Sequence, residues 1–546
     1  MDQDLTRPTA SQSSPVGATV SPGAVAPPGS VDSDTARLHQ MGYAQELKRS
    51  MGSFSNFAVS FSIISILTGG ITTYFLGMDA GGPLVITIGW FIVGALVLCV
   101  GMGMAEICSA YPTAGGLYYW SAQLAQKNKA AWSWGCGWFN LVGQVAITAS
   151  IDYGLATYVA FIISLYSASF HSNYKWVLLF YGIILAFHGL LNTFRVQLVS
   201  LLADISAWWH LIGTLVIVGA LLIVPSHHQS VSFLFHHANL TGWSGPFAGV
   251  YVFAIGLLLA QYTLTGYDAS AHMTEETQSA AIGGPKSMVR AIYVSIIAGF
   301  ILNLAMTLAI QGGQKDYATL AANGPTAGGQ LFVNAITGAG GKLLVILATV
   351  AMFFCGLASV TANSRMIYAF SRDGAVPGHR LWHRLHPTTR TPVNAVWLAA
   401  VAAFALGLPS LYQHGGAPVA FFAIVSIGTV GLYVAYAIPI YLRLRAGSSF
   451  TPGPWNLGRW SKPIGMIAVV WVVIITILFF APQFWPWLTL NNFNWAGPLF
   501  VVLMAAVFIW YGLSAHKWFT GPRIQGSAEE LAELEREYAA GIAPPD

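Results

Sequence analysis

The feature that most constrains this chain is a series of long apolar segments that contain few or no charged side chains. Twelve such windows occur along the 546 residues, and a helix needs about 20 apolar residues to cross a hydrocarbon core about 30 Å thick. Only 8% of the residues are charged, against about 25% in an average soluble domain. A soluble globular enzyme is thereby excluded. We predict an all-α polytopic membrane protein with 12 transmembrane helices.

The expected spans divide into two halves. The first half holds 55–78, 83–105, 132–166, 176–194, 197–225 and 247–271. The second holds 288–311, 342–368, 392–411, 417–442, 463–482 and 497–515. The charge-free stretches 391–442 and 463–516 are too long for one helix each, so we expect turns at the Pro/Gly/Asn clusters 407–418 and 481–498.

Basic residues indicate how the spans are oriented. With these spans, 21 of the 24 Lys and Arg residues fall on one side of the membrane, and only Lys175, Lys315 and Lys342 fall on the other. Lys and Arg accumulate in cytoplasmic loops. We therefore expect a multi-pass protein of the plasma or inner membrane with both termini in the cytoplasm.

The two ends of the chain differ from the middle. Residues 1–37 are rich in Ser, Pro, Gly and Ala and lack a signal-peptide pattern, which predicts a disordered cytoplasmic tail. Residues 38–54 begin with LHQMGYAQELKRS and form either a short interfacial helix or a plain linker. In the tail 516–546, Ser527 and Glu530 have capping-box spacing, which predicts a solvated helix over 527–539.

Two spans carry sequences that disfavour a continuous helix. The first contains Thr68-Gly69-Gly70 near its centre, and the sixth contains Tyr262-Thr-Leu-Thr-Gly-Tyr-Asp268. In a bilayer an unwound backbone is tolerated only around a cavity or inside protein, although small residues also serve close helix packing. The breaks lie five spans apart, which suggests two inverted five-helix repeats, 55–225 and 247–443, followed by two added helices in 463–515.

Such breaks suit a zwitterion. The half-helix after Gly70 would direct free N–H groups and its positive dipole end at a carboxylate. The carbonyls that end the half-helix before Thr263 would face an ammonium group. Recognition by the main chain would require no buried formal charge, which is costly in a bilayer.

Four ordered motifs carry a resemblance to a known family: LTGGITTYF, MAEICSAYPTAGGLYYWSAQLA, GYDASAHMTEET and NSRMIYAFSRDGAVPGH. They resemble the amino acid/choline transporter family of the amino acid-polyamine-organocation superfamily, which includes plant bidirectional amino acid transporters and GABA and choline permeases. The resemblance covers roughly 38–515. It implies a five-plus-five inverted-repeat fold with two extra helices and the transport of amino acids or amines.

The resemblance also implies positions for the substrate site. Thr68, Gly69 and Gly70 match the first-helix break, and Tyr262, Thr263, Leu264 and Thr265 match the sixth-helix break, with Tyr262 in the place of an aromatic gate. The first break reads LTGG where many relatives have G-x-G, which leaves the geometry around the carboxylate open. Two further candidates for substrate binding are Ser65 and Gln144.

Polar residues inside the spans are functional candidates by default. His210 in the fifth span titrates near neutral pH when unperturbed and could carry a coupling proton, or it could be a neutral histidine bonded to the backbone. Several proton-dependent members of the superfamily have a lysine near this place in the fifth helix, and that lysine resembles a built-in substitute for sodium. Ser359 and Thr361 could form a small-cation site or only bond neighbouring helices.

The remaining charged residues suggest gating or structural roles. Glu106 at the inner end of the second span and Arg365 and Arg372 at the inner end of the eighth could form a Glu–Arg latch, or could only fix topology. Asp268 follows the sixth-span break, and we expect it to cap the next half-helix rather than to bind a substrate amine. Asp152 and Asp204 are expected near helix ends or facing the bundle interior.

The sequence therefore predicts a secondary active transporter of amino acids such as GABA, proton-coupled or exchanging, working by alternating access in the lipid bilayer. A choline or polyamine permease is the alternative within this class, and a channel or receptor is the alternative outside it. No metal-binding triad, phosphate loop or nucleophile elbow is found. We expect no enzymatic activity, cofactor or metal, and the scattered net charge of +4 predicts no nucleic-acid partner.

Overall fold

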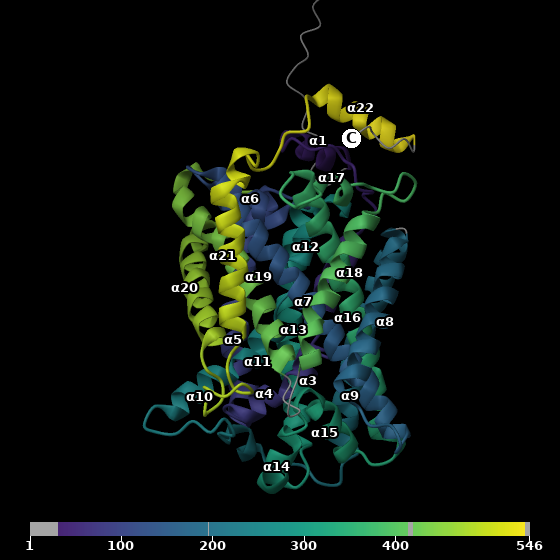
Figure 1. Cartoon of the computed structure of the whole chain (residues 1–546), viewed down its shortest axis with the longest axis vertical. Coiled ribbons are helices and arrows are strands. Elements are labelled where there is room, and N and C mark those ends of the chain that lie inside the picture. The colour runs from purple at the N-terminus through teal and green to yellow at the C-terminus, as the bar shows by residue number, and fades with distance from the viewer. Residues whose placement is uncertain (1–30, 195, 413–418, 541–546) are drawn as a thin grey trace, which may run out of the picture.

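A computed structural model describes residues 31–194, 196–412 and 419–540 of the chain. It is a bundle of helices that run along its long axis (Figure 1). Within the described residues, 11 helices are long and apolar enough to cross a membrane. The sixth predicted span is absent from that set only because its apolar helix, 248–263, is cut short by a break. The all-helical, multi-span prediction is confirmed.

The helices of the first half correspond to the first five predicted spans. They are α2 (Ser53–Ile64), α3 (Gly69–Thr72), α4 (Tyr74–Asp79), α5 (Trp90–Ala110), α7 (Lys129–Tyr166), α8 (Tyr174–Thr193) and α9 (Val196–Ile223). The first three are pieces of one interrupted span. A short helix, α6 (Gly116–Leu124), lies between α5 and α7.

The helices of the second half repeat this order. They are α10 (Ala248–Gly256), α11 (Leu258–Thr263), α12 (Ala269–His272), α13 (Ala280–Leu308), α16 (Ala339–Arg372), α18 (Val393–Gly407) and α19 (Val419–Ala446). The two added helices are α20 (Ser461–Phe480) and α21 (Ala496–Leu513). Helices α14 (Gly313–Ala321), α15 (Ala327–Ala335) and α17 (His379–Trp382) lie in connections. Thus each half begins with a broken span, and the two broken spans run in opposite directions (Figure 1).

The outer surface of the bundle is apolar, as a lipid-facing surface must be. Leu215 on α9, Ile477 on α20 and Val502 on α21 expose 72%, 63% and 69% of their surface. Helix α13 begins at Ala280 and not at 288 as predicted, because Lys286 and Arg290 continue the helix with exposed side chains at its end. Charged residues near a helix end thus made the predicted span too short.

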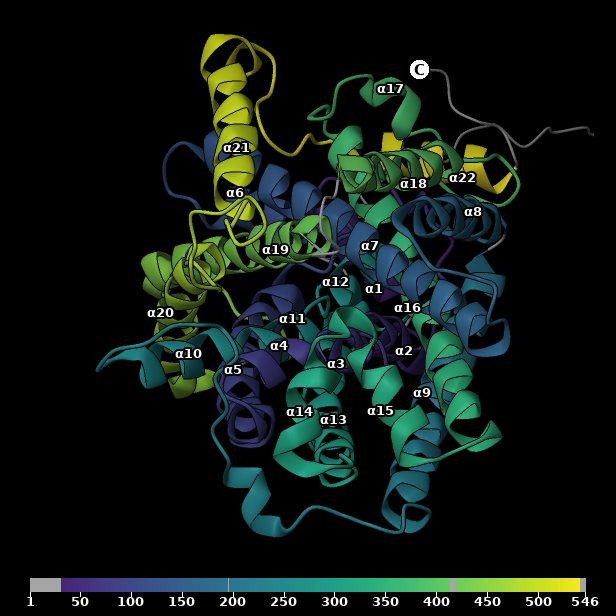
Figure 2. The same ribbon diagram turned by 60° about the horizontal axis from the view of Figure 1, so that its bottom comes forward.

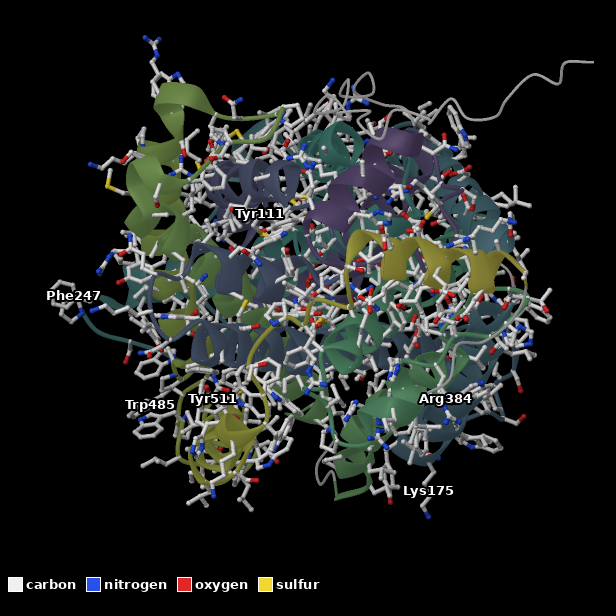
Figure 3. All side chains as sticks on the ribbon, turned by 90° about the horizontal axis from the view of Figure 1, so that it is seen from above. Tyr111, Lys175, Phe247, Arg384, Trp485 and Tyr511 are labelled. Carbon is white, nitrogen blue, oxygen red and sulfur yellow. The ribbon has the colours of Figure 1, made fainter. Side chains whose placement is uncertain are left out.

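Both ends of the described chain lie at one end of the bundle, which we call the tail end. Helix α1 (Val31–Gln40) and helix α22 (Ala528–Ala539) meet there, and α22 lies across that end when it is viewed from above (Figures 1 and 3). Within the predicted tail 1–37, residues 31–37 belong to α1, and residues 1–30 lie outside the described residues.

The interfacial helix expected over 38–50 is wrong, because α1 ends at Gln40 and residues 43–50 are not helical. The N–H groups of Ser50 and Met51 donate to Glu276 O at 3.0 and 2.8 Å, so the end of this segment packs on the protein. The capping box of Ser527 and Glu530 is confirmed. However, α22 is docked and not freely solvated, because Glu535 accepts from His39 Nε2 and Gln45 N, both at 2.7 Å.

The expected turns also fit, since α18 ends at Gly407 and residues 481–495 connect α20 with α21. Residues 413–418 of the first turn lie outside the described residues.

Candidate functional site

The first broken span is interrupted just before the predicted position, because α2 ends at Ile64 and α3 already includes Gly69 and Gly70. Ser65 ends α2 with a left-handed backbone, φ 31°, and its carbonyl accepts from the N–H groups of both Thr68 and Gly69, at 2.8 and 2.9 Å. Helix α3 restarts at Gly69. Among the described residues, the N–H groups of Gly70 and Ile71 make no backbone hydrogen bond. The break therefore offers two free donors at the start of a half-helix.

The second broken span is interrupted between Thr263 and Ala269. Gly266 there has φ 102°, and a Cβ at this position would lie 2.3 Å from Ile63 Cγ2. Only glycine fits both this backbone conformation and this close approach. In the part of the chain that the structure describes, the carbonyls of Tyr262 and Thr263 accept no backbone N–H group outside a helix. This break therefore offers acceptors.

The two breaks lie against each other near the centre of the bundle, where Figure 2 shows α3, α11 and α12. A Cβ built on Gly69 would come within 2.9 Å of Thr263 Cα and of Thr263 Oγ1. The two breaks are thus in direct contact at Gly69 and Thr263.

A small cavity lies at this junction. Its lining comes from both breaks and from helices α7 and α16: Ile63, Ile64, Thr68, Gly69, Ile147, Ile151, Tyr262, Thr263, Thr265 and Cys355. The free space is about that of one water molecule. No charged side chain lines the cavity, so a ligand there would meet peptide groups, hydroxyls and aliphatic side chains.

The predicted substrate residues fall into two groups: those that reach the cavity and those that lie beside it. Thr68, Gly69, Tyr262, Thr263 and Thr265 line the cavity. Ser65 reaches it through its hydroxyl, 2.6 Å from Thr68 Oγ1. The hydroxyl of Tyr262 is 3.0 Å from Ser150 Oγ.

The other predicted substrate residues lie beside the cavity. The carbonyl of Leu264 accepts from Tyr433 OH at 2.8 Å. A Cβ on the buried Gly70 would meet nothing within 4 Å. Gln144 is not in the lining and donates to Asp268 Oδ2 at 2.7 Å. The sequence analysis missed Ile147 and Ile151, although their spacing of four residues on one helix face was a usable signal.

His210 is connected to the first break. Its Nδ1 lies 2.8 Å from Ser206 O, and because a carbonyl only accepts, Nδ1 carries the hydrogen. Its Nε2 lies 2.7 Å from Ser65 Oγ, so Ser65 donates to it when the ring is neutral. The ring is fully buried. His210, Ser65 and Thr68 thus form a chain of hydrogen bonds that ends at the cavity.

Ser359 and Thr361 each bond a neighbouring helix, and a small-cation site at these residues stays a prediction. The hydroxyl of Ser359 is 2.8 Å from Thr148 Oγ1 on α7. The hydroxyl of Thr361 donates to Asn192 Oδ1 on α8 at 2.6 Å. The two side chains are two residues apart on one helix and bond different neighbours, so they act as interhelical contacts.

Two buried ion pairs lie between the cavity and the tail end. Arg365 Nε is 2.7 Å from Glu276 Oε1, and Arg372 Nη2 is 3.0 Å from Glu275 Oε1. The expected pairing of Arg365 with Glu106 is wrong. The carboxylate of Glu106 faces the segment before α20 and lies 3.4 Å from Arg443 Nε, whereas the short helix η3 (Thr274–Glu276), which follows α12, brings both of the other glutamates to α16.

Asp268 does not cap the half-helix α12, which corrects the expected role. It occupies the N-cap position without a side-chain capping bond. Its buried carboxylate instead accepts from Tyr436 OH at 2.6 Å and from Gln144 Nε2 at 2.7 Å. Neighbouring side chains satisfy it better than the helix end does.

A further carboxylate, Asp373, closes the tail end. Tyr118 OH donates to its Oδ2 at 2.7 Å, and Tyr43 OH and Arg523 N donate to it at 3.0 Å. Burial raises the pKa of Asp373, although these donors and Arg372 act in the opposite direction. Asp373 lies in one of the sequence motifs that carry the family resemblance. The sequence analysis did not predict its contact with the two tails.

Comparisons with known proteins agree with this geometry. The amino acid permease family matches residues 51–509. The amino-acid permease BAT1 of Arabidopsis thaliana is 44% identical over 509 residues, which are 90% of this chain and 96% of that protein. Its Oryza sativa homolog is 44% identical over 519 residues, 90% of this chain and 96% of that protein. A putative polyamine transporter of Candida albicans is 29% identical over 535 residues, 94% of each chain.

With a family match across nearly all of the spans and two breaks meeting at a cavity, this chain belongs to the amino acid permease family and is a transporter, not an enzyme.

Proposed function

We propose that this permease is a secondary active carrier of small zwitterionic amino acids such as GABA, and that it works by alternating access. The observation that supports this most is the junction of the two breaks. Among the described residues, the N–H groups of Gly70 and Ile71 at the first break make no backbone hydrogen bond, and the carbonyls of Tyr262 and Thr263 at the second break accept none outside a helix. The carboxylate would bind at the donors and the ammonium at the acceptors.

The lining supports a zwitterion over a polyamine. A polyamine has no carboxylate for the free N–H groups, and its several charges would need anionic partners. The cavity has none in its lining, and its aliphatic wall of Ile64, Ile147 and Ile151 suits a short hydrocarbon backbone. A choline permease would need an aromatic or anionic cage, and Tyr262 is the single aromatic residue in the lining.

We further propose that transport is coupled to protons and that His210 takes part. Its hydrogen bond to Ser65, and that of Ser65 to Thr68, connect a titratable ring with the cavity. A change in the protonation of His210 would reverse the direction of the Ser65 hydrogen bond, because a protonated Nε2 donates. The hydroxyls of Ser65 and Thr68 at the first break would then change their roles as hydrogen-bond donor and acceptor together.

The gate belongs to the same proposal. The excess of basic residues supports a cytoplasmic tail end, so the ion pairs Arg365–Glu276 and Arg372–Glu275 would close the cytoplasmic path. Tyr262 would close the cavity on the side of Ser150. With free space for about one water, the structure corresponds to a closed state without substrate.

The test is uptake of labelled substrate by purified protein in liposomes. Competition by the twenty protein amino acids, GABA, choline and polyamines would identify the substrate class. A carrier saturates with substrate and is stimulated by substrate on the opposite side. Thr263→Leu, which fills the junction, should abolish uptake at normal expression. Flux that rises without saturation would indicate a channel, and competition by polyamines alone would overturn the zwitterion proposal.

A further inference from the structure

We propose that Asp268 and His272 together form a proton-binding pair that links the substrate cavity to the cytoplasmic gate. The inference rests on the proposed proton-coupled function and assigns a second group to it. The pair lies on the second break and on the short half-helix α12 that follows it. Both side chains are fully buried.

Asp268 carries a negative charge in a low-dielectric environment. Uncharged donors bind it: Tyr436 OH at 2.6 Å, Gln144 Nε2 at 2.7 Å and Asn140 Nδ2 at 3.2 Å. Such donors stabilise the ionised form but do not neutralise it. Within the described residues, the ionisable nitrogen nearest to this carboxylate is His272 Nε2, 3.4 Å from Asp268 Oδ2.

The hydrogen on His272 can be assigned from its other contact. Nδ1 lies 2.9 Å from Ala114 O, and a carbonyl only accepts, so Nδ1 is the protonated nitrogen of the neutral ring. Nε2 then has a free lone pair and no hydrogen-bond partner among the described residues. A proton taken from water would form an N–H bond at Nε2 and create an ion pair with Asp268. Its return to water would restore the neutral ring.

The electrostatics favours this site over His210 for holding the proton. The polar contacts of His210 are Ser206 and Ser65, which are not charged. A proton there would add an isolated positive charge inside the membrane, at a cost of several kcal/mol. At His272 the added charge lies within 4 Å of an existing negative one, which favours the charged form.

The groups that face the pair from neighbouring elements do not supply another counter-charge. Tyr436 OH on α19 donates to Asp268, and the rings of Tyr433 on α19 and Tyr267 on the break pack against Tyr436. Glu275 on η3 is joined to His272 through Ala114, and Arg365 and Arg372 on α16 bind the acidic residues of η3. Both arginines are engaged by Glu276 and Glu275. From α13, Lys286 is exposed.

The pair is mechanically connected to the gate through one residue. Ala114 accepts the His272 hydrogen bond with its carbonyl and donates its N–H to Glu275 Oε1 at 2.9 Å. Glu275 in turn binds Arg372. Proton loss from Nε2 leaves the Nδ1 hydrogen bond to Ala114 in place but changes it from a charge-assisted bond to a weaker neutral one. The attachment of α12 to the loop before α6 and, through it, the ion pair would be weakened. Opening towards the cytoplasm would be coupled to proton release.

The experiment compares Asp268→Asn and His272→Gln with His210→Gln in liposomes that contain a pH-sensitive dye. With one proton per substrate, a gradient of one pH unit supports up to tenfold accumulation, since tenfold corresponds to about 1.4 kcal/mol. We expect both variants of the pair to lose that accumulation and the substrate-driven proton movement, while counterflow at equal pH persists. The matched control is His188→Gln, which alters the other buried histidine–aspartate pair, 3.2 Å from Asp152 on uninterrupted helices, and which should keep proton movement.

The outcomes are separable. Absence of counterflow in the native protein would contradict the proposed function itself. Native counterflow without proton movement, or proton movement retained in His272→Gln, would overturn the pair. Loss of accumulation and of proton movement in His210→Gln alone would assign the proton to His210 instead. If the variants of the pair fail to fold, calorimetry of substrate binding to the His210→Gln variant in buffers of different ionisation enthalpy decides: one proton exchanged per substrate supports the pair, and none overturns it.

Discussion

Gly69→Ala tests most directly whether the two breaks meet. The added Cβ would lie 2.9 Å from Thr263 Cα and Oγ1 and 3.0 Å from Thr263 Cγ2, whereas carbon atoms in good contact are about 3.5–4.0 Å apart. One of these partners is backbone, so α3 and α11 must separate by at least about 0.6 Å. Overpacking of this kind costs about 1–3 kcal/mol. If that cost falls on the state that binds substrate, affinity falls by roughly fivefold to 150-fold.

The assay is counterflow of labelled substrate in liposomes, with the apparent affinity and the initial rate measured together. Gly219→Ala on α9 is the matched control, because its added Cβ would meet nothing within 4 Å. Thermal unfolding of both variants in detergent separates a local effect from a general loss of stability. Equal affinity and equal rate in the two variants would refute the close approach of the breaks and, with it, the cradle that they are proposed to form.

Three further results are expected. Ser65→Ala leaves the buried His210 Nε2 without its donor, at a cost of about 1–3 kcal/mol, which a lower melting temperature and a weaker substrate affinity would reveal; an unchanged protein would contradict the relay. Arg365→Gln leaves Glu276 as a buried unpaired charge, at a cost of about 3–5 kcal/mol, and neutralising both residues should restore part of the melting temperature. Because burial raises the pKa of Asp373, folding favours its protonated form, so its contribution to stability is full below the unfolded value of about 3.9 and is lost as the pH rises through the raised pKa. The protection factors of residues 519–531 in hydrogen exchange, which are corrected for the intrinsic slowing of exchange in acid, should therefore be higher in acid, and Asp373→Asn should remove the pH dependence of these protection factors.

The sequence predicts the spans and breaks well because each depends on local physics. A charge-free window long enough to cross the bilayer has few alternatives to a helix. The low helix propensity of Thr68-Gly69-Gly70 indicates the break to within a few residues, since α2 ends at Ile64 and α3 begins at Gly69. The misplaced start of α13 has a local cause too, since Lys286 and Arg290 are helical residues whose charge only marks the membrane boundary.

The pairing of charges could not be predicted in the same way. Arg365 and Glu106 are both at the inner ends of spans, but which acid meets which base depends on how helices separated by many residues are rotated. The chain places Glu276 on η3, directly after a half-helix whose direction is set by the break. Asp268 illustrates the same limit. Its position at the start of α12 predicted a capping role, whereas its observed partners come from α7 and α19.

The order of residues along the second broken span explains why the breaks and the ion pairs would move together. Thr265 lines the cavity, Asp268 and His272 follow on α12, and Glu275 and Glu276 follow on η3. A substrate bound at the free peptide groups would therefore act on the segment from Thr265 to Glu276. This segment is too short to bend, so its movement would reach the ion pairs of the proposed gate. Each ion pair is buried and expensive to break singly. Under the proposed mechanism, opening would therefore require α12 and η3 to move together, which is the condition for a carrier that does not leak.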